Sequence, residues 1–281
     1  MFYIIKQTTK QTHFSGVFME QRLKNVRQVF LDMDGTIYHG SRLYPTTLPF
    51  LNFLKSRGIG YKFLSNNSSF STAEYVAKLA RFGVEAVEDE FYISTDYCID
   101  YIKANHPEVK KLFIMGMESI FASFETAGFI VTDTDPDAVV VAFDRTLTYE
   151  KLCRTAYFIK QGVPAFATHP DVFCPTDQPT FLVDCGAFIA CLETATRCKI
   201  KVLGKPDPGF LRAAAARCGV LPENTLMAGD RLATDISLGI NAGSVTCRLV
   251  GPGADLTPCE GIIPDFTLND LGELQAIWEK L

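Results

Sequence analysis

The sequence has little of what several protein classes require. None of its apolar runs approaches the length of a transmembrane helix, so no membrane partner is expected. Its nine cysteines form no C-x-x-C pair and no zinc-like spacing, which predicts reduced thiols in a cytoplasmic protein. Only four histidines occur, and none is assigned to a metal. Basic residues are not in excess: the net charge of −5 argues against nucleic acid as a partner.

What is present is typical of a globular protein. Hydrophobic residues make up 47% of the chain and charged residues 21%. With 281 residues the chain is long enough for two domains. Residues 1–21 precede the first strand by more than a domain needs, and we expect an N-terminal extension that is poorly ordered, or translation that begins at Met19.

Strand-like and helix-like segments alternate after Leu23, which predicts an α/β fold with parallel sheets and crossover helices. Ser71 and Glu74 form a helix-start signal, and Gly83 and Gly243 stand where helices should end. The predicted strands are 29–31, 61–64, 111–115, 138–142, 165–167, 200–203, 226–228 and 244–249. The predicted helices are 46–56, 72–82, 96–104, 119–127, 149–160, 187–197, 208–218 and 233–241.

The segment LDMDGTIYHG, Leu31 to Gly40, is the most informative stretch. It places Asp32 and Asp34 at the end of a buried strand, and Gly35 then allows a sharp turn. In a parallel sheet this end of the strand is where ligands bind. One carboxylate can attack a substrate while the other moves protons, and a metal ion can relieve their repulsion.

Asp-Met-Asp-Gly-Thr resembles the first motif of the haloacid dehalogenase (HAD) superfamily. The three further motifs follow in order: Ser65 in KFLSNNSS, Lys205 in VLGKPDP, and Asp230 with Asp235 in GDRLATDI. The segments SNNSS, VAFDRTLTYEKL and ATHPD resemble sequences of the NagD-like branch, which includes p-nitrophenylphosphatases and pyridoxal-phosphate phosphatases. The resemblance covers residue 23 to the C-terminus.

This resemblance implies two domains. Motifs one and two lie before residue 70 and motifs three and four after residue 200, with about 130 residues between them. We expect a doubly wound, Rossmann-like HAD core of residues 22–106 and 199–281. An α/β cap domain of residues 107–198 is inserted into it. The resemblance also allows a homodimer in which the cap domains form the interface.

The resemblance also assigns roles to the motif residues. Asp32 is the nucleophile that forms an aspartyl phosphate, and Asp34 is the general acid/base. Thr36 fixes the turn or acts as a simple cap. Mg²⁺ is held by Asp32, Asp230 and the main-chain carbonyl of Asp34, and the phosphate receives donors from Ser65, Asn66 and Asn67. Lys205 stabilises the negative charge of the transition state. Asp235 orients either Lys205 or a metal-bound water.

The cap is expected to choose the substrate. Its segment from Ala167 to Phe188 holds His169, Cys174, Asp177 and Asp184. Asp184 either contacts the substrate or caps the helix expected from Ala187. For Arg145 the two alternatives are contact with the substrate and an internal ion pair. For His39 they are a place near the mouth of the active site and a side chain that is merely solvated.

The sequence therefore predicts a Mg²⁺-dependent phosphatase that hydrolyses small phosphorylated metabolites through an aspartyl phosphate. A phosphotransferase or mutase on the same core is the alternative. The motifs do not distinguish among sugar phosphates, nucleotides and pyridoxal phosphate.

Overall fold

The computed structural model describes residues 21–175 and 179–281. These residues form two compact units: unit 1 consists of the chain up to Lys62 together with Ala214–Leu281, and unit 2 is Phe63–Ala213. Apart from residue 21, the predicted N-terminal extension lies outside the described residues, as does Asp177.

A parallel sheet organises unit 1. Its strands run in the order β15 (Phe266–Leu268), β14 (Val245–Leu249), β13 (Thr225–Gly229) and β1 (Gln28–Leu31). Strand β4 (Gly60–Ser65) begins beside β1, where the Gly60 N–H donates to the Arg27 carbonyl at 3.0 Å. Every residue of β1 and β13 is buried, as expected for strands covered on both faces.

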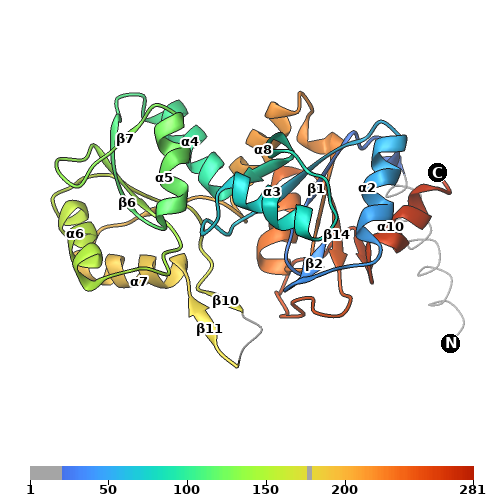
Figure 1. The fold of residues 1–281 in the computed structure, drawn as a ribbon. Coiled ribbons are helices and arrows are strands. Elements are labelled where there is room, and N and C mark those ends of the chain that lie inside the picture. Colours follow the sequence, from blue (N-terminus) through green and yellow to red (C-terminus); the bar gives the residue numbers. More distant parts are fainter. Residues whose placement is uncertain (1–20, 176–178) are drawn as a thin grey trace, which may run out of the picture. The chain divides into compact units, whose positions relative to one another are not determined.

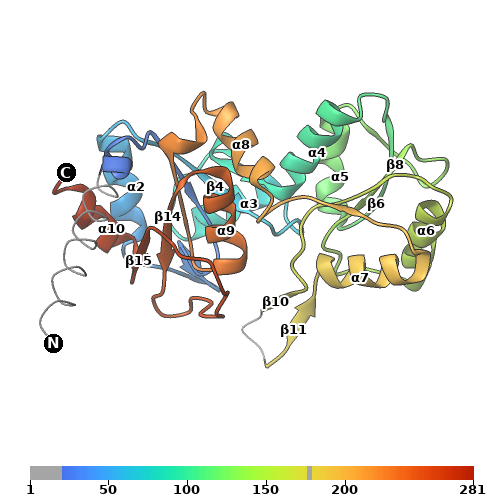
Figure 2. The same cartoon turned by 180° about the vertical axis from the view of Figure 1, so that it is seen from behind.

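Helices complete unit 1 (Figures 1 and 2). Helices α2 (Thr47–Ser56) and α10 (Leu271–Trp278) lie side by side, with the rings of Phe53 and Trp278 6.1 Å apart. A π-helical turn, η4 (Leu232–Ile236), leads directly into α9 (Ser237–Ala242). The smaller elements are the hairpin β2 (Tyr38–His39) and β3 (Arg42–Leu43) and the 3-10 turn η3 (Pro222–Asn224).

Unit 2 contains a five-stranded parallel sheet of its own. Its order is β12 (Lys201–Val202), β9 (Ala165–Ala167), β8 (Ala138–Val141), β6 (Lys111–Met115) and β7 (Ile130–Val131). Alternate strand residues pack against α6 (Tyr149–Lys160) and α7 (Cys185–Thr196) in one apolar cluster. On the other face Phe166 contacts Tyr101 of α4 (Ser94–Asn105), with ring centroids 5.9 Å apart.

Strand β4 crosses from unit 1 into unit 2, and the remaining elements of unit 2 include its neighbour in the sheet. Strand β5 (Phe91–Ile93) pairs in parallel with β4, and α3 (Thr72–Arg81) starts with the predicted capping box between Ser71 and Glu74. Helix α8 (Pro208–Arg217) connects unit 2 to unit 1. The others are α5 (Phe121–Thr126), the hairpin β10 (Phe173–Pro175) and β11 (Phe181–Val183), and the 3-10 turns η1 (Glu88–Glu90) and η2 (Glu118–Ile120).

The eight predicted strands and the eight predicted helical segments occur near their expected positions, and the α/β class is confirmed. Two segments predicted as single helices are divided: 119–127 is η2 followed by α5, and 233–241 is η4 followed by α9. Helix α10, strands β5, β7 and β15 and both hairpins were not expected.

The compact units end at residues 62 and 213, not at the predicted domain limits. The core of 22–106 and 199–281 and the cap of 107–198 stay predictions.

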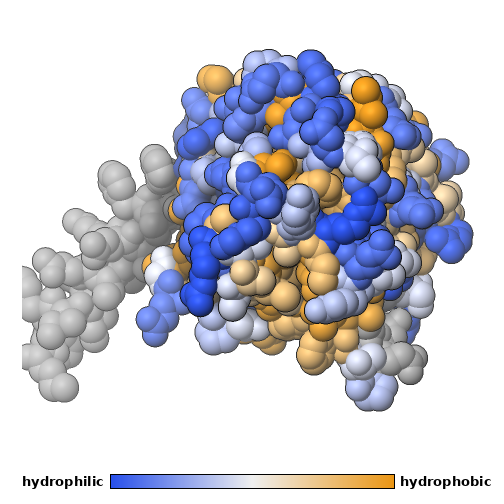
Figure 3. Space-filling model, turned by 90° about the vertical axis from the view of Figure 1, so that its left-hand side faces the viewer, coloured by the Kyte–Doolittle hydropathy of each residue, from blue (hydrophilic) through white to orange (hydrophobic). Residues whose placement is uncertain are grey.

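No helix in the described ranges is long and apolar enough to cross a membrane. Exposed large hydrophobic side chains of unit 2 include Ile130, Tyr149 and Tyr157. On the face seen in Figure 3, hydrophobic residues are interspersed with hydrophilic ones.

Candidate active site

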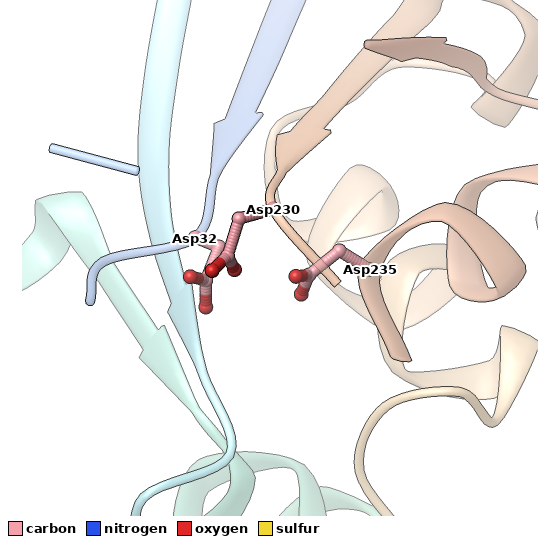
Figure 4. A group of neighbouring side chains, drawn as sticks. All are labelled: Asp32, Asp230 and Asp235. Carbon is pink, nitrogen blue, oxygen red and sulfur yellow. The ribbon is translucent and has the colours of Figure 1, made fainter. Parts of the chain in front are cut away.

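Three aspartates meet at the carboxyl end of the unit 1 sheet. Asp32 and Asp230 directly follow the neighbouring strands β1 and β13, and the Asp32 N–H still donates to the Ala228 carbonyl at 2.9 Å. Asp235 comes from η4 and points toward the other two (Figure 4). One carboxylate oxygen from each residue lies within 4.8 Å of the others. The sheet edge thus gathers three oxygen ligands where parallel sheets bind ligands.

Burial makes this cluster electrostatically costly without a counter-charge. Asp230 is 3% exposed and Asp235 1%. Desolvation, followed by the charges of Asp32 and Asp235, raises the pKa of Asp230 to about 8. Asp230 Oδ2 accepts a hydrogen bond from the Asp255 N–H at 2.7 Å, whereas its buried Oδ1 has no hydrogen-bond partner within the described residues. A divalent cation fits this site because it would satisfy that oxygen and offset the repulsion.

Gly35 makes room for Asp230. Its φ is +81°, a left-handed conformation that suits glycine. A Cβ built on Gly35 would lie 2.3 Å from Asp230 Oδ2. Beside it, the buried Thr36 hydroxyl donates to Asp32 Oδ2 at 3.3 Å, so the turn-fixing alternative for Thr36 is the one observed. The first motif therefore shapes the pocket as well as supplying a carboxylate.

Asp34 is exposed beside the cluster. Its Oδ1 lies 3.8 Å from Nδ1 of His39, which is also exposed, on the β2–β3 hairpin. Tyr44, just after this hairpin, donates to the Pro252 carbonyl at 2.7 Å. Its pKa is raised by burial and by the charges of Asp230 and Asp34. Asp34 is thus accessible to solvent.

A loop of unit 1 supports the cluster without belonging to any motif. Asp255, whose N–H binds Asp230, pairs through Oδ2 with Arg231 Nε at 3.4 Å. Arg248 donates to the Asp230 carbonyl at 3.2 Å and to the Asp255 carbonyl at 3.1 Å. Sequence reasoning missed both residues: Asp255 donates through a main-chain N–H that almost any residue would supply, and Arg248 binds main-chain carbonyls, which no sequence pattern indicates.

Unit 2 holds the other motif residues. The buried Lys205 donates through Nζ to the Leu64 carbonyl at 3.1 Å. Asn66 brackets the main chain of Lys205: Oδ1 accepts from its N–H at 2.7 Å, and Nδ2 donates to its carbonyl at 3.0 Å and to Asp171 at 3.1 Å. The Asn66 side chain thus positions the main chain of Lys205, and the predicted donation from Asn66 and Asn67 to a phosphate stays a prediction. Ser65 Oγ lies 3.2 Å from the Tyr75 hydroxyl.

The predicted specificity residues fall into two groups. Asp184 caps α7 by accepting from the Cys185 N–H at 2.6 Å, and its Oδ1 lies 2.9 Å from Nε2 of the fully buried His169. Asp184 therefore caps α7, as one of its two predicted alternatives, and the specificity roles of Asp184 and His169 stay predictions. Cys174 is partly exposed on β10, and Arg145 is exposed.

Comparison with known proteins agrees with this geometry. A family model for haloacid dehalogenase-like hydrolases matches residues 29–130, and a HAD hydrolase-like model matches residues 202–274. The ribonucleotide monophosphatase NagD of Escherichia coli is 31% identical over 254 residues, which cover 90% of this chain and 99% of NagD. The 5'-nucleotidase YutF of Bacillus subtilis is 31% identical over 80% of this chain and 87% of YutF.

The chain belongs to the haloacid dehalogenase-like hydrolases. The crystal structure of a Thermotoga maritima 4-nitrophenylphosphatase matches with a TM-score of 0.85 and 34% identity, over 91% of this chain and 98% of that one. This chain is therefore a NagD-like HAD phosphatase, a hydrolase of phosphate monoesters.

In this HAD phosphatase the two family models cover all four motifs and leave out residues 131–201. The structure brings Asp32 and Asp230 together and adds Asp235, which was expected to act indirectly. The catalytic and metal-binding roles of these residues, of Asp34 and of Lys205 stay predictions.

Replacing Gly35 with alanine should disable the site more than it unfolds the protein. The positive φ costs roughly 1–2 kcal/mol of stability for a residue with a Cβ, and the new methyl group displaces Asp230. Gly243→Ala is the matched control, since Gly243 has φ +89° but nothing within 4 Å of a built Cβ. Urea unfolding should show similar losses in both variants, while phosphatase activity falls at least about tenfold only in Gly35→Ala. Equal activity in the two variants would contradict the steric argument.

Asn66→Asp should destabilise the protein although it changes only one atom. The carboxylate still accepts from the Lys205 N–H, but it cannot donate to the Lys205 carbonyl and it faces Asp171. We expect a loss of about 1–3 kcal/mol in the free energy of unfolding. Asn67→Asp is the control, because Asn67 Oδ1 only accepts, from the N–H and hydroxyl of Ser69. The bracketing role fails if both variants unfold at the same urea concentration.

Proposed function

We propose that this phosphatase hydrolyses small phosphorylated metabolites with the help of Mg²⁺ and through an aspartyl phosphate on Asp32. The observation that carries the proposal is the cluster of Asp32, Asp230 and Asp235, with a buried Asp230 oxygen that meets no donor in the described chain. Such an arrangement is stable only when a cation or a proton occupies it.

The carboxylates of Asp32, Asp230 and Asp235 would hold the ion, and the main-chain carbonyl of Asp34 would add a fourth oxygen. Hard oxygen donors, completed by water, suit Mg²⁺. When bound, the ion would neutralise the negative charge that a phosphate dianion brings to these carboxylates.

The chain's own residues divide the chemistry. Asp32 attacks phosphorus in line, and the bond to the leaving oxygen breaks. Asp34 protonates that oxygen and then takes a proton from the water that hydrolyses the aspartyl phosphate. The accessibility of Asp34 supports this role, and the Thr36 hydroxyl restrains Asp32.

Lys205 and Ser65 are assigned to the phosphoryl oxygens. A buried ammonium group needs anionic or strongly polar company, and the Lys205 main chain is held by Asn66. A preorganised cation of this kind stabilises charge that develops in the transition state.

The substrates are proposed to be small. The relatives are named as a ribonucleotide monophosphatase, a 5'-nucleotidase and, in Staphylococcus aureus, an acid sugar phosphatase. All nine cysteines are free, which is consistent with the proposed cytoplasmic location. A homodimer through the cap stays a prediction.

Asp32→Asn should abolish turnover without unfolding the protein. The amide is nearly isosteric but cannot attack phosphorus, so kcat should fall by about 10⁴–10⁶. Release of inorganic phosphate from 4-nitrophenyl phosphate measures it, and the melting temperature controls for folding. Adding an acceptor alcohol to the wild type separates hydrolysis from phosphotransfer, because transfer would yield a new phosphate ester. Appreciable turnover by a folded Asp32→Asn protein would rule out the nucleophile.

Mg²⁺ binding should release a proton. Below pH 8 the raised pKa keeps Asp230 largely protonated in the metal-free protein, so the ion must displace that proton. The affinity should therefore rise by about tenfold per pH unit from pH 6 to pH 8 and then level off. Calorimetry in buffers of different ionisation enthalpy would count close to one proton at pH 7. Asp230→Asn should remove this pH dependence, and a pH-independent affinity in the wild type would contradict the site.

A further inference from the structure

Arg145 is an exposed cation without an internal role. It follows β8, and its guanidinium carbon lies 5.8 Å from the centre of the Phe70 ring. Across the residues that the structure describes, no carboxylate pairs with it. The internal ion pair that the sequence allowed for Arg145 is therefore not formed.

The neighbouring acid is already occupied. Asp144 is buried and accepts hydrogen bonds from Lys151 Nζ at 2.6 Å and from the N–H and hydroxyl of Thr146 at 2.8 and 2.7 Å. Arg154 offers a contrast within the same unit: it lies 5.6 Å from the Phe113 ring and 3.8 Å from Asp133. Arg145 has the same aromatic support without the acidic partner.

Arg145 also packs against the loop of the second motif, because Phe70 directly follows the SNNSS segment. The Phe143 N–H and the Thr168 hydroxyl both donate to Ser68 Oγ, at 3.0 and 3.1 Å, so the ends of β8 and β9 are tied to this loop. Phe70 contacts Tyr75 at 5.6 Å between ring centres, and Tyr75 reaches Ser65. One packed group in unit 2 thus joins Arg145, which follows the carboxyl end of β8, to Ser65, which ends β4 and is assigned to the phosphate.

We propose that Arg145 binds a second anionic group, a carboxylate or another phosphate, carried by the leaving part of the substrate. The inference rests on the proposed function. Guanidinium matches both anions with two parallel hydrogen bonds, and Phe70 restricts the side chain so that less entropy is lost on binding. The favoured substrates are then phosphate monoesters with an additional negative charge.

Two substrate pairs test this specificity. 3-Phosphoglycerate and glycerol 3-phosphate differ by a carboxylate, and fructose 1,6-bisphosphate and fructose 6-phosphate differ by a phosphate. In the wild type, kcat/KM should be higher for the more anionic member of at least one pair. Arg145→Ala should lower that ratio by about tenfold or more, mainly through KM, as expected for a lost charge-assisted hydrogen bond. Arg145→Lys should recover part of it, and Arg154→Ala should leave it unchanged.

The outcomes separate the two proposals. If the wild type releases no phosphate from any substrate with Mg²⁺, the proposed function fails. If it is active but Arg145→Ala and Arg154→Ala keep the wild-type ratios in both pairs, the role of Arg145 is overturned. The pair that responds identifies the second group as a carboxylate or a phosphate.

Discussion

The repulsion among three carboxylates at one sheet edge is the constraint on which the site depends. Asp32, Asp230 and Asp235 stand so close that burial and mutual charge raise the pKa of Asp230 to about 8. Main-chain donors offset part of this cost: Asp230 receives an N–H from Asp255, and Asp235 receives one from Arg231 at 3.1 Å. Main-chain geometry thus helps to hold these carboxylates together, and the proposed Mg²⁺ would offset their repulsion.

Two glycines make this crowding possible, and one of them links the first motif to the fourth through close packing. Gly35 of the first motif leaves the space that Asp230 of the fourth occupies. Gly229 of the fourth motif does the same for Asp235, whose Cβ would lie 2.4 Å from a Cβ built on Gly229. The glycine-aspartate pairing in these motifs is therefore a packing requirement as well as a chemical one. A carboxylate can approach a strand end this closely only where the neighbouring residue has no side chain.

The sequence predicted well what depends on runs of apolar residues and on side-chain chemistry. Strands such as β6 and β8 are buried on both faces, so their composition alone identifies them. Prediction from the sequence failed where main-chain geometry or tertiary contacts determine the role of a residue. The loop at Asp255 acts through its main chain, which carries no residue-type signal. The hold of the Asn66 side chain on the Lys205 main chain was also not predicted, because it depends on tertiary contacts between residues that are far apart in the sequence. Short strands such as β15 have too few residues for a periodic pattern.

The proposed roles divide substrate recognition between two parts of the chain: one part binds the phosphoryl group that all phosphate monoesters share, and the other binds the leaving group. Nucleotides, sugar phosphates and aryl phosphates present the same phosphoryl group, and the motifs assigned to it fall inside the two matched family models. Residues 131–201, which neither model matches, contain Arg145 and the buried pair of His169 and Asp184. A buried pair fixes the shape of a loop, whereas an exposed, aromatic-supported guanidinium can discriminate between leaving groups. Selectivity can therefore change through residues of this segment while the three carboxylates and their glycines remain untouched.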